Sequence, residues 1–142
     1  MDSDLENVID QYHRAVEAVV RGDSSPQELL WSRREDVSLA NPLGPTVRGW
    51  PEVSKALRAA VSQLSDGQML GVERISAYSD GDLAYTHEIE RSRVRLGNAP
   101  EPVTSSLRVT TIFRREEDGW KLVHRHADPI TTARPIGSVA ED

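Results

Sequence analysis

Cysteine is absent from this 142-residue chain. Its absence excludes disulfide bonds, thiolate nucleophiles, iron–sulfur clusters and zinc sites built on cysteine. The sequence also lacks a Gly-rich phosphate loop, a Gly-x-Ser-x-Gly elbow and a His-Glu-x-x-His motif, which are signatures of nucleotide binding, serine hydrolases and zinc proteases. The fold must therefore be stabilised by packing, and we expect a protein that works without a cofactor.

Long hydrophobic runs and a positive charge balance are absent as well. The apolar stretch from Ala15 to Val20 is interrupted by charge and is far shorter than the ~20 residues that a membrane-spanning helix needs. Residues Met1–Asp4 are acidic and lack the basic-then-apolar pattern of a signal peptide. The formal charge of −6 disfavours binding to nucleic acid backbones, which relies on clustered Lys and Arg. We therefore expect a cytoplasmic protein with neither a membrane nor a nucleic acid partner.

The first half of the chain has the period of amphipathic helices. Ser3 and Glu6 have the spacing of a capping box, and Gly22 marks the end of the first helix. Pro26 and Pro51 stand at first-turn positions and begin a second and a third helix. Because the length fits one core, we predict a single domain over residues 1–128 and a flexible tail over 129–142.

The second half has the signals of a strand meander. Gly-containing turns at 80–81, 97–98 and 118–119 separate long β-prone runs at about 68–78, 83–95, 103–115 and 120–127. Two shorter strands are predicted at 36–41 and 46–48. Helices followed by a meander indicate an α+β fold, with three N-terminal helices packed on a strongly bent antiparallel, or mixed, sheet of about six strands.

This order of elements, with Arg108-x-Thr110 and the closing run 118–126 (DGWKLVHRH), resembles the nuclear transport factor 2-like superfamily, in its SnoaL-like or ketosteroid-isomerase-like branch. The resemblance extends from about Leu5 to Asp128. It implies a cone-shaped α+β barrel, an apolar pocket between helices and sheet, and a homodimer formed through the convex sheet face. The superfamily includes ketosteroid isomerase, scytalone dehydratase, limonene epoxide hydrolase, polyketide cyclases and an association domain that assembles kinases, so the fold does not determine function.

The last predicted strand carries the candidate acid/base residues. Residues two apart share a face of a strand. One face would hold Trp120, Leu122, His124, His126 and Asp128, and the other Lys121, Val123, Arg125 and Ala127. The burial that a tryptophan and a leucine favour places the first set toward the pocket. His126 is then the candidate general acid/base, oriented by Asp128, with His124 beside the substrate. The opposite orientation makes the histidines part of an interface and leaves Arg125 to the pocket.

Glutamates on the neighbouring strand supply a second set of candidates. Glu88 and Glu90 share one face, and the next strand carries Arg108 and Thr110 together. A Glu–Arg pair inside the cone would orient a polar group of the substrate, with Glu as a base. The same pair outside would be a surface salt bridge. The two histidines at 124 and 126 also raise the possibility of a metal, but the sequence shows no clear third ligand, so no metal site is predicted.

Apolar residues around the pocket complete the predicted site. The chain has only 5% aromatic residues, and two tryptophans stand at helix boundaries where the cone would open. The residues expected at the mouth and walls are Tyr12, Trp31, Leu43, Trp50, Val53 and Leu57.

The sequence is compatible with two functions. The first is a cofactor-independent pocket protein that binds a small, mainly apolar or amphipathic molecule, with isomerase, lyase, hydrolase or cyclase-type acid/base chemistry if it is an enzyme. The alternative is a non-catalytic ligand-binding or oligomerisation module of the same fold.

Overall fold

Three helices and a six-stranded mixed sheet make up the protein, of which the computed structural model describes residues 1–141. The helices are α1 (Ser3–Val20), α2 (Ser25–Leu30) and α3 (Trp50–Val61). The strands are β1 (Ser38–Ala40), β2 (Val47–Arg48), β3 (Leu64–Asp80), β4 (Leu83–Leu96), β5 (Val103–Glu116) and β6 (Gly119–Asp128). The predicted α+β class and order of elements are confirmed. None of the helices in residues 1–141 is both long and apolar enough to cross a membrane.

The start of α1 differs from the prediction. Asp2 is the N-cap residue, and its carboxylate accepts a hydrogen bond of 2.7 Å from the amide of Leu5. The capping box predicted for Ser3 and Glu6 is therefore wrong by one residue. An aspartate caps as well as a serine and adds a negative charge at the positive end of the helix dipole.

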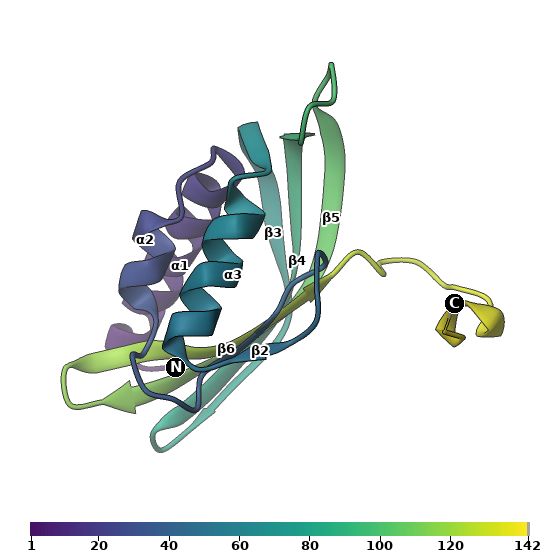
Figure 1. The fold of residues 1–142 in the computed structure, drawn as a ribbon. Helices are drawn as coiled ribbons and strands as arrows, with labels where there is room; N and C mark the ends of the chain where they lie inside the picture. The colour runs from purple at the N-terminus through teal and green to yellow at the C-terminus, as the bar shows by residue number, and fades with distance from the viewer. Residues whose placement is uncertain (142) are drawn as a thin grey trace.

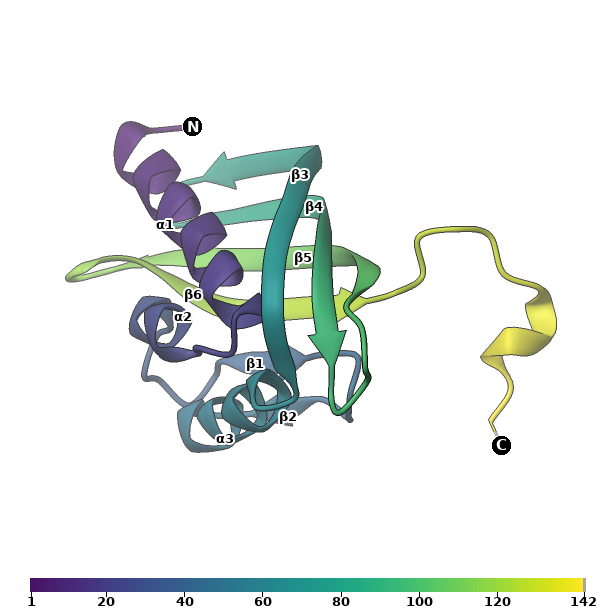
Figure 2. The same ribbon diagram turned by 90° about the horizontal axis from the view of Figure 1, so that it is seen from above.

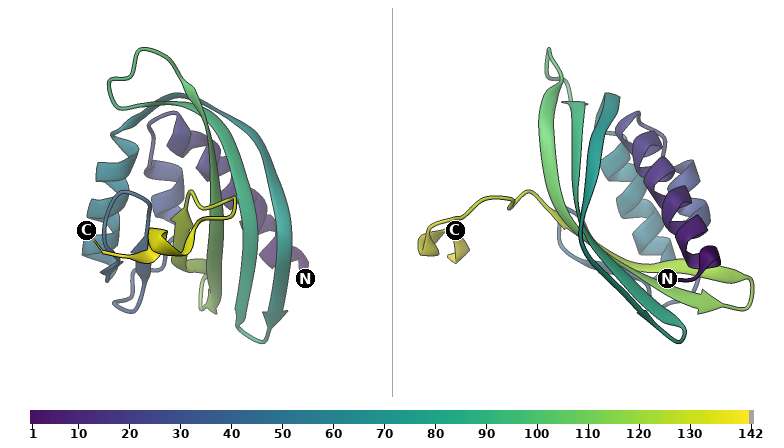
Figure 3. Two further views of the ribbon diagram at one scale, coloured as in Figure 1. Left: turned by 90° about the vertical axis from the view of Figure 1, so that its right-hand side faces the viewer. Right: turned by 180° about the vertical axis from the view of Figure 1, so that it is seen from behind.

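The sheet is strongly bent and open, with the strand order β2-β1-β6-β5-β4-β3. β1 and β6 are parallel, while the other neighbours are antiparallel. β3 has three register shifts against β4, and such bulges increase bend and twist. The upper halves of β3, β4 and β5 stand upright and their lower halves turn beneath the helices (Figure 1 and Figure 3). All three helices therefore lie in the hollow of the sheet.

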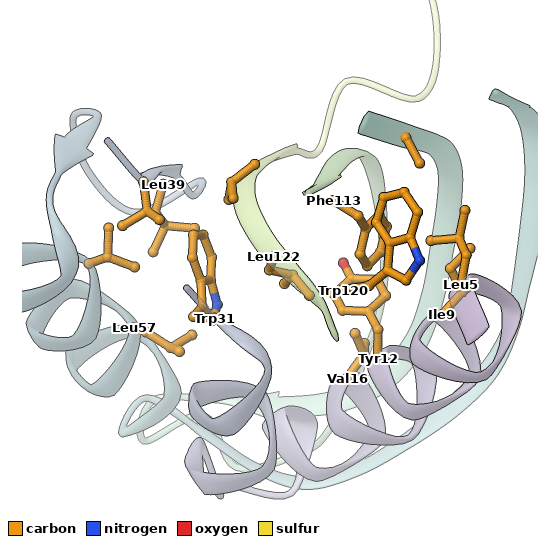
Figure 4. Close-up of a cluster of buried hydrophobic side chains, with 14 of the residues drawn as sticks. Leu5, Ile9, Tyr12, Val16, Trp31, Leu39, Leu57, Phe113, Trp120 and Leu122 are labelled. Carbon is orange, nitrogen blue, oxygen red and sulfur yellow. The ribbon is translucent and has the colours of Figure 1, made fainter. Parts of the chain in front are cut away.

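One end of this hollow is filled by the core. Tyr12 and Phe113 meet edge to face, with ring centroids 6.0 Å apart, and Leu5, Ile9 and Trp120 pack around them (Figure 4). Trp31, Leu39 and Leu57 form a second group on the far side of Leu122 (Figure 4). This packing anchors α1 and the loop after α2 on the sheet.

β6 contains a register shift that decides which of its residues face the helices. Phe113 of β5 pairs with Leu122, but the preceding Ile112 pairs with His124, so Val123 is an extra residue without a partner on β5. Because such a bulge reverses the alternation of side chains, Leu122 and Arg125 lie on the same face of the sheet. The two-face division predicted for residues 120–128 is therefore wrong beyond Val123.

The C-terminal segment leaves the body of the protein after β6. Residues 129–141 are all exposed. Within this segment, Ile136–Val139 form a 3₁₀ turn that lies well away from the sheet (Figure 2). The predicted domain limit at residue 128 and the flexibility of 129–142 stay predictions, and Asp142 lies outside the described residues.

The end of α1 lies directly against β3 at Gly67. A Cβ atom placed on Gly67 would be 2.0 Å from the carbonyl oxygen of Val20, a distance that no side chain tolerates. The main chains of helix and strand are therefore in contact, and this contact sets the distance between them.

His13 and Glu88 join the middle of α1 to the sheet. His13 Nε2 lies 2.8 Å from Glu88 Oε1, and Arg74 Nε donates to Glu88 Oε2 at 3.3 Å. Burial disfavours the charged imidazole, but the hydrogen bond and charge of Glu88 outweigh it and raise the pKa of His13 above 6.5. Burial likewise opposes ionisation of Glu88, but His13 and Arg74 hold its pKa below 4.5. The two groups therefore favour each other's charged form.

We predict that Gly67→Ala lowers the free energy of unfolding by about 1–3 kcal/mol, because the added methyl group forces α1 away from β3. Gly71→Ala is the matched control, since nothing lies within 4 Å of a Cβ there, and its effect should stay within about 0.5 kcal/mol. Urea denaturation measures both. Equal stabilities of the two variants would contradict the close contact.

We also predict that His13→Gln destabilises the protein most between about pH 4.5 and pH 6.5. The contribution of His13 is fully present below its unfolded pKa and is lost as the pH rises through the raised folded value. The contribution of Glu88 is present above its unfolded pKa and is lost as the pH falls through the lowered one. Urea unfolding of both proteins over a pH series tests this, and a stability difference that is constant from pH 5 to about pH 8.5 would contradict it.

Candidate functional site

A cavity of about 250 Å³ lies between the helices and the sheet, at the end of the hollow opposite the aromatic core. The C-terminal halves of α1 and α3 form one wall, with Val16, Leu57 and Val61 among the lining residues. The ends of β4 and β6 and the start of β5 form the other. Its lining is mostly apolar, and the polar members are Gln27, Asn41, Glu90, Ser92, Ser105 and Arg125.

A buried ion pair stands at the inner end of this cavity. Arg125 Nη1 donates to Glu90 Oε2 at 2.9 Å, and Nη2 donates to Glu90 Oε1 at 3.1 Å. The side chains of Arg125 and Glu90 are only 10% and 4% exposed. Two parallel hydrogen bonds between a guanidinium and a carboxylate form a strong and directional contact. A single buried charge in this apolar interior would be strongly unfavourable, so each member of the pair requires the other.

Tyr12 joins this pair to the core. Its hydroxyl donates to Glu90 Oε2 at 3.0 Å and accepts hydrogen bonds from Thr111 Oγ1 at 3.1 Å and from Arg125 Nη1. Burial raises the pKa of Tyr12 well above its ordinary 10.0, against the opposing charge of Arg125. Burial disfavours the charged guanidinium, but Glu90 and Tyr12 outweigh it and raise the pKa of Arg125. The tyrosine therefore stays protonated and the guanidinium stays charged.

The structure brings four of the predicted site residues to this cavity or its inner end. Glu90, Leu43 and Leu57 line it, and Tyr12 holds Glu90 from the core side. Leu43 is 66% exposed, so it lies at the rim, whereas Leu57 is a wall residue. Three other predicted pocket residues serve packing instead, because Trp31 and Val53 are fully enclosed in the core and Trp50 is covered by the guanidinium of Arg33 at 3.8 Å.

The histidines of β6 lie on the outer face of the sheet, away from the helices. His126 Nε2 is 3.3 Å from Asp128 Oδ2, so the expected His–Asp contact forms. Arg108 Nε donates to the other oxygen of Asp128 at 2.7 Å. These residues line a shallow groove of about 160 Å³ together with Thr110, whose hydroxyl lies 2.8 Å from His87 Nδ1. The expectation that the histidine face lines the pocket is therefore wrong, because the bulge at Val123 turns this face outward.

Two further contacts differ from the prediction. His124 Nδ1 lies 2.8 Å from the hydroxyl of Ser38 in the parallel strand β1, also on the outer face. The predicted pairing of Glu88 or Glu90 with Arg108 is not formed, because Arg108 pairs across the sheet with Ile89 and so faces outward. Glu88 is buried beneath α1 with His13 and Arg74, and it is not among the residues that line the cavity.

Sequence reasoning placed Arg125 in the pocket only as the alternative orientation, and it missed Gln27, Ser92 and Ser105. Ser92 and Ser105 are cross-strand partners on the cavity wall. A signal for Ser92 was present, since β4 alternates strictly from Ala84 to Val94 and Ser92 shares the buried face with Glu90. Gln27 is 1% exposed and accepts a hydrogen bond from Trp31 Nε1 at 3.4 Å, and no pattern in the sequence indicates its burial.

Comparison with known proteins is consistent with this architecture. The model of the SnoaL-like domain family matches residues 5–131. A candidate dehydratase of the NTF2-like family from Streptomyces avermitilis has a TM-score of 0.75 at 26% identity, covering 92% of this chain and 99% of that one. A ketosteroid isomerase-like protein from Erwinia carotovora atroseptica has a TM-score of 0.76 at 14% identity, covering 92% and 96%.

An assembly domain is also similar. A candidate calcium/calmodulin-dependent protein kinase type II association domain from Thiobacillus denitrificans has a TM-score of 0.69 at 23% identity, covering 87% of this chain and 93% of that one. Among proteins with curated descriptions, none matches the sequence significantly. The family match spans both the helices and the whole sheet, so the resemblance inferred from the closing strand is confirmed. This chain belongs to the SnoaL-like domain family of the nuclear transport factor 2-like superfamily.

Proposed function

We propose that this protein binds a small, mainly apolar molecule in the cavity between its helices and its sheet. The observation that carries the proposal is the buried Glu90–Arg125 pair at the end of an otherwise apolar cavity. Ligand sites in proteins are typically apolar clefts with a few polar groups that fix orientation, and perturbed charged groups gather at such sites. A volume of about 250 Å³ suits a compact molecule of one or two rings.

Binding is supported better than catalysis at this site. Glu90 and Arg125 are the only titratable side chains that line the cavity within residues 1–141, and each is held by the other. Glu90 is therefore the candidate base if the bound molecule reacts. Its carboxylate already accepts three hydrogen bonds, one from Tyr12 and two from Arg125. A catalytic role for His126 and Asp128 stays a prediction, and it would have to operate in the outer groove.

We predict that Ala60→Phe weakens binding of naphthalene-2-methanol at least about tenfold, which corresponds to 1.4 kcal/mol. Ala60 lines the cavity, so a phenyl ring there occupies the space of the ligand. Ala59→Phe is the matched control, because Ala59 is exposed on the same helix. Isothermal titration calorimetry measures the affinities. Equal binding by wild type and both variants would place the ligand elsewhere and contradict the proposal.

The outer face of the sheet supports a second proposal, a homodimer. Tyr78, Tyr85 and Ile112 form a cross-strand row over β3, β4 and β5 on this face. Tyr78 is 60% exposed and Tyr85 is 36% exposed. Large apolar side chains that are grouped on a surface commonly mark an interface. Because a two-fold dimer uses the same patch on both subunits, this row would contribute from each copy.

We predict that the wild-type protein elutes as a dimer in size-exclusion chromatography with light scattering, and that Tyr85→Glu converts it to a monomer by placing a charge in the interface. Leu29→Glu is the matched control, since Leu29 is 72% exposed on α2 and lies on the other side of the sheet. A monomeric wild type, or a monomeric Leu29→Glu variant, would argue against this interface.

A further inference from the structure

The two charges at the end of the cavity already neutralise each other. Glu90 accepts hydrogen bonds from both terminal nitrogens of Arg125, and no other titratable side chain in the described part of the chain lines the cavity. From this geometry we propose that the cavity selects molecules whose polar end is uncharged, such as an alcohol or a ketone, and discriminates against carboxylates. This inference rests on the proposed binding function of the cavity.

The pair retains hydrogen-bonding capacity for such a ligand. Arg125 uses only Nη1 and Nη2 in its hydrogen bonds to described residues, which leaves its Nε–H as a donor. Oε1 of Glu90 accepts one hydrogen bond, whereas Oε2 accepts two. A ligand hydroxyl can therefore donate to Glu90 while it accepts from Arg125. The hydroxyls of Ser92 and Ser105 on the wall provide further donors and acceptors.

A carboxylate would find a much poorer environment. A free guanidinium binds a carboxylate through two parallel hydrogen bonds, but Glu90 already occupies that arrangement on Arg125. A second carboxylate would lose its hydration on entering an apolar cavity and would meet the negative charge of Glu90 at close range. Attraction to Arg125 would be offset by this repulsion. The carboxylate would therefore recover little of the hydration free energy that it loses on entering the cavity.

Glu90 is therefore the residue that determines charge selectivity. Without its negative charge, Arg125 would be an uncompensated cation at the end of an apolar cavity, and an anionic ligand would supply the missing partner. The consequence is specific to Glu90, because carboxylates elsewhere on the protein do not neutralise Arg125.

Two probes with the same apolar body test the inference: naphthalene-2-methanol, which is neutral, and naphthalene-2-carboxylate, which is anionic at neutral pH. Isothermal titration calorimetry gives the ratio of their affinities for each protein. We expect the wild type to bind the alcohol at least about tenfold more tightly than the carboxylate, and Glu90→Gln to shift this ratio toward the carboxylate by at least about tenfold.

Two control variants separate charge selectivity from general damage. Glu73→Gln removes a carboxylate on the exposed side of β3, where Glu73 pairs with Arg91, and its ratio should equal that of the wild type. The double variant Glu90→Gln with Arg125→Gln removes both interior charges together and should keep the preference for the alcohol. If Glu90→Gln alone does not fold, the affinity ratio of the wild type still tests whether the cavity discriminates against carboxylates.

Different results would overturn different conclusions. Wild-type binding of the carboxylate as tight as that of the alcohol, or an unchanged ratio in folded Glu90→Gln, would overturn the charge selectivity while leaving the cavity as the binding site. Failure of the wild type to bind either probe, or binding that Ala60→Phe does not weaken, would instead contradict the proposed function of the cavity.

Discussion

A single unpaired residue, Val123, decides which side chains of β6 face the helices. Before the bulge, Trp120 and Leu122 face inward and complete the core; beyond it, Arg125 and Ala127 face inward and reach the cavity. Without the extra residue, the alternation of the strand would turn His124 and His126 toward the helices and Arg125 outward. Glu90 would then be a buried carboxylate without a counter-charge. The interior ion pair therefore depends on the bulge.

The ion pair in turn divides the hollow of the sheet into two parts with different roles. On one side, Tyr12 and Phe113 belong to a closely packed core, and on the other side the walls surround the cavity. A buried ion pair is weak evidence for stability, because apolar residues of similar size often stabilise a fold as well or better. The pair lies at the end of a cavity, with Tyr12 bonded to both of its members, and the proposed binding of a ligand rests on this position.

The sequence predicts the architecture well and the site only in part. Helical periodicity, turn glycines and the closing strand were sufficient to predict the α+β fold and the family, because these signals are local.

The prediction of the site depended on the register of the strands. Strict alternation in β4 correctly grouped Glu88 with Glu90, but Glu88 meets His13 of α1 whereas Glu90 meets Arg125 of β6. In β6 the bulge reversed the faces, and no residue type marks it, since Val123 suits a regular strand. The contact between His126 and Asp128 was predicted and forms, but it lies on the outer face. Arg108 also binds Asp128 there, whereas it was expected to meet Glu88 or Glu90.

The contact between Gly67 and Val20 bears on how this fold diverges. The gap between α1 and β3 is set by main chain against main chain, and this contact does not involve Val16, Leu57 or Val61, whose side chains determine the shape and polarity of the cavity. The backbone frame and the chemistry of the interior can therefore change independently during evolution. Substitutions in the interior therefore change the chemistry of the cavity in this chain, whereas a substitution at Gly67 changes the frame that surrounds it.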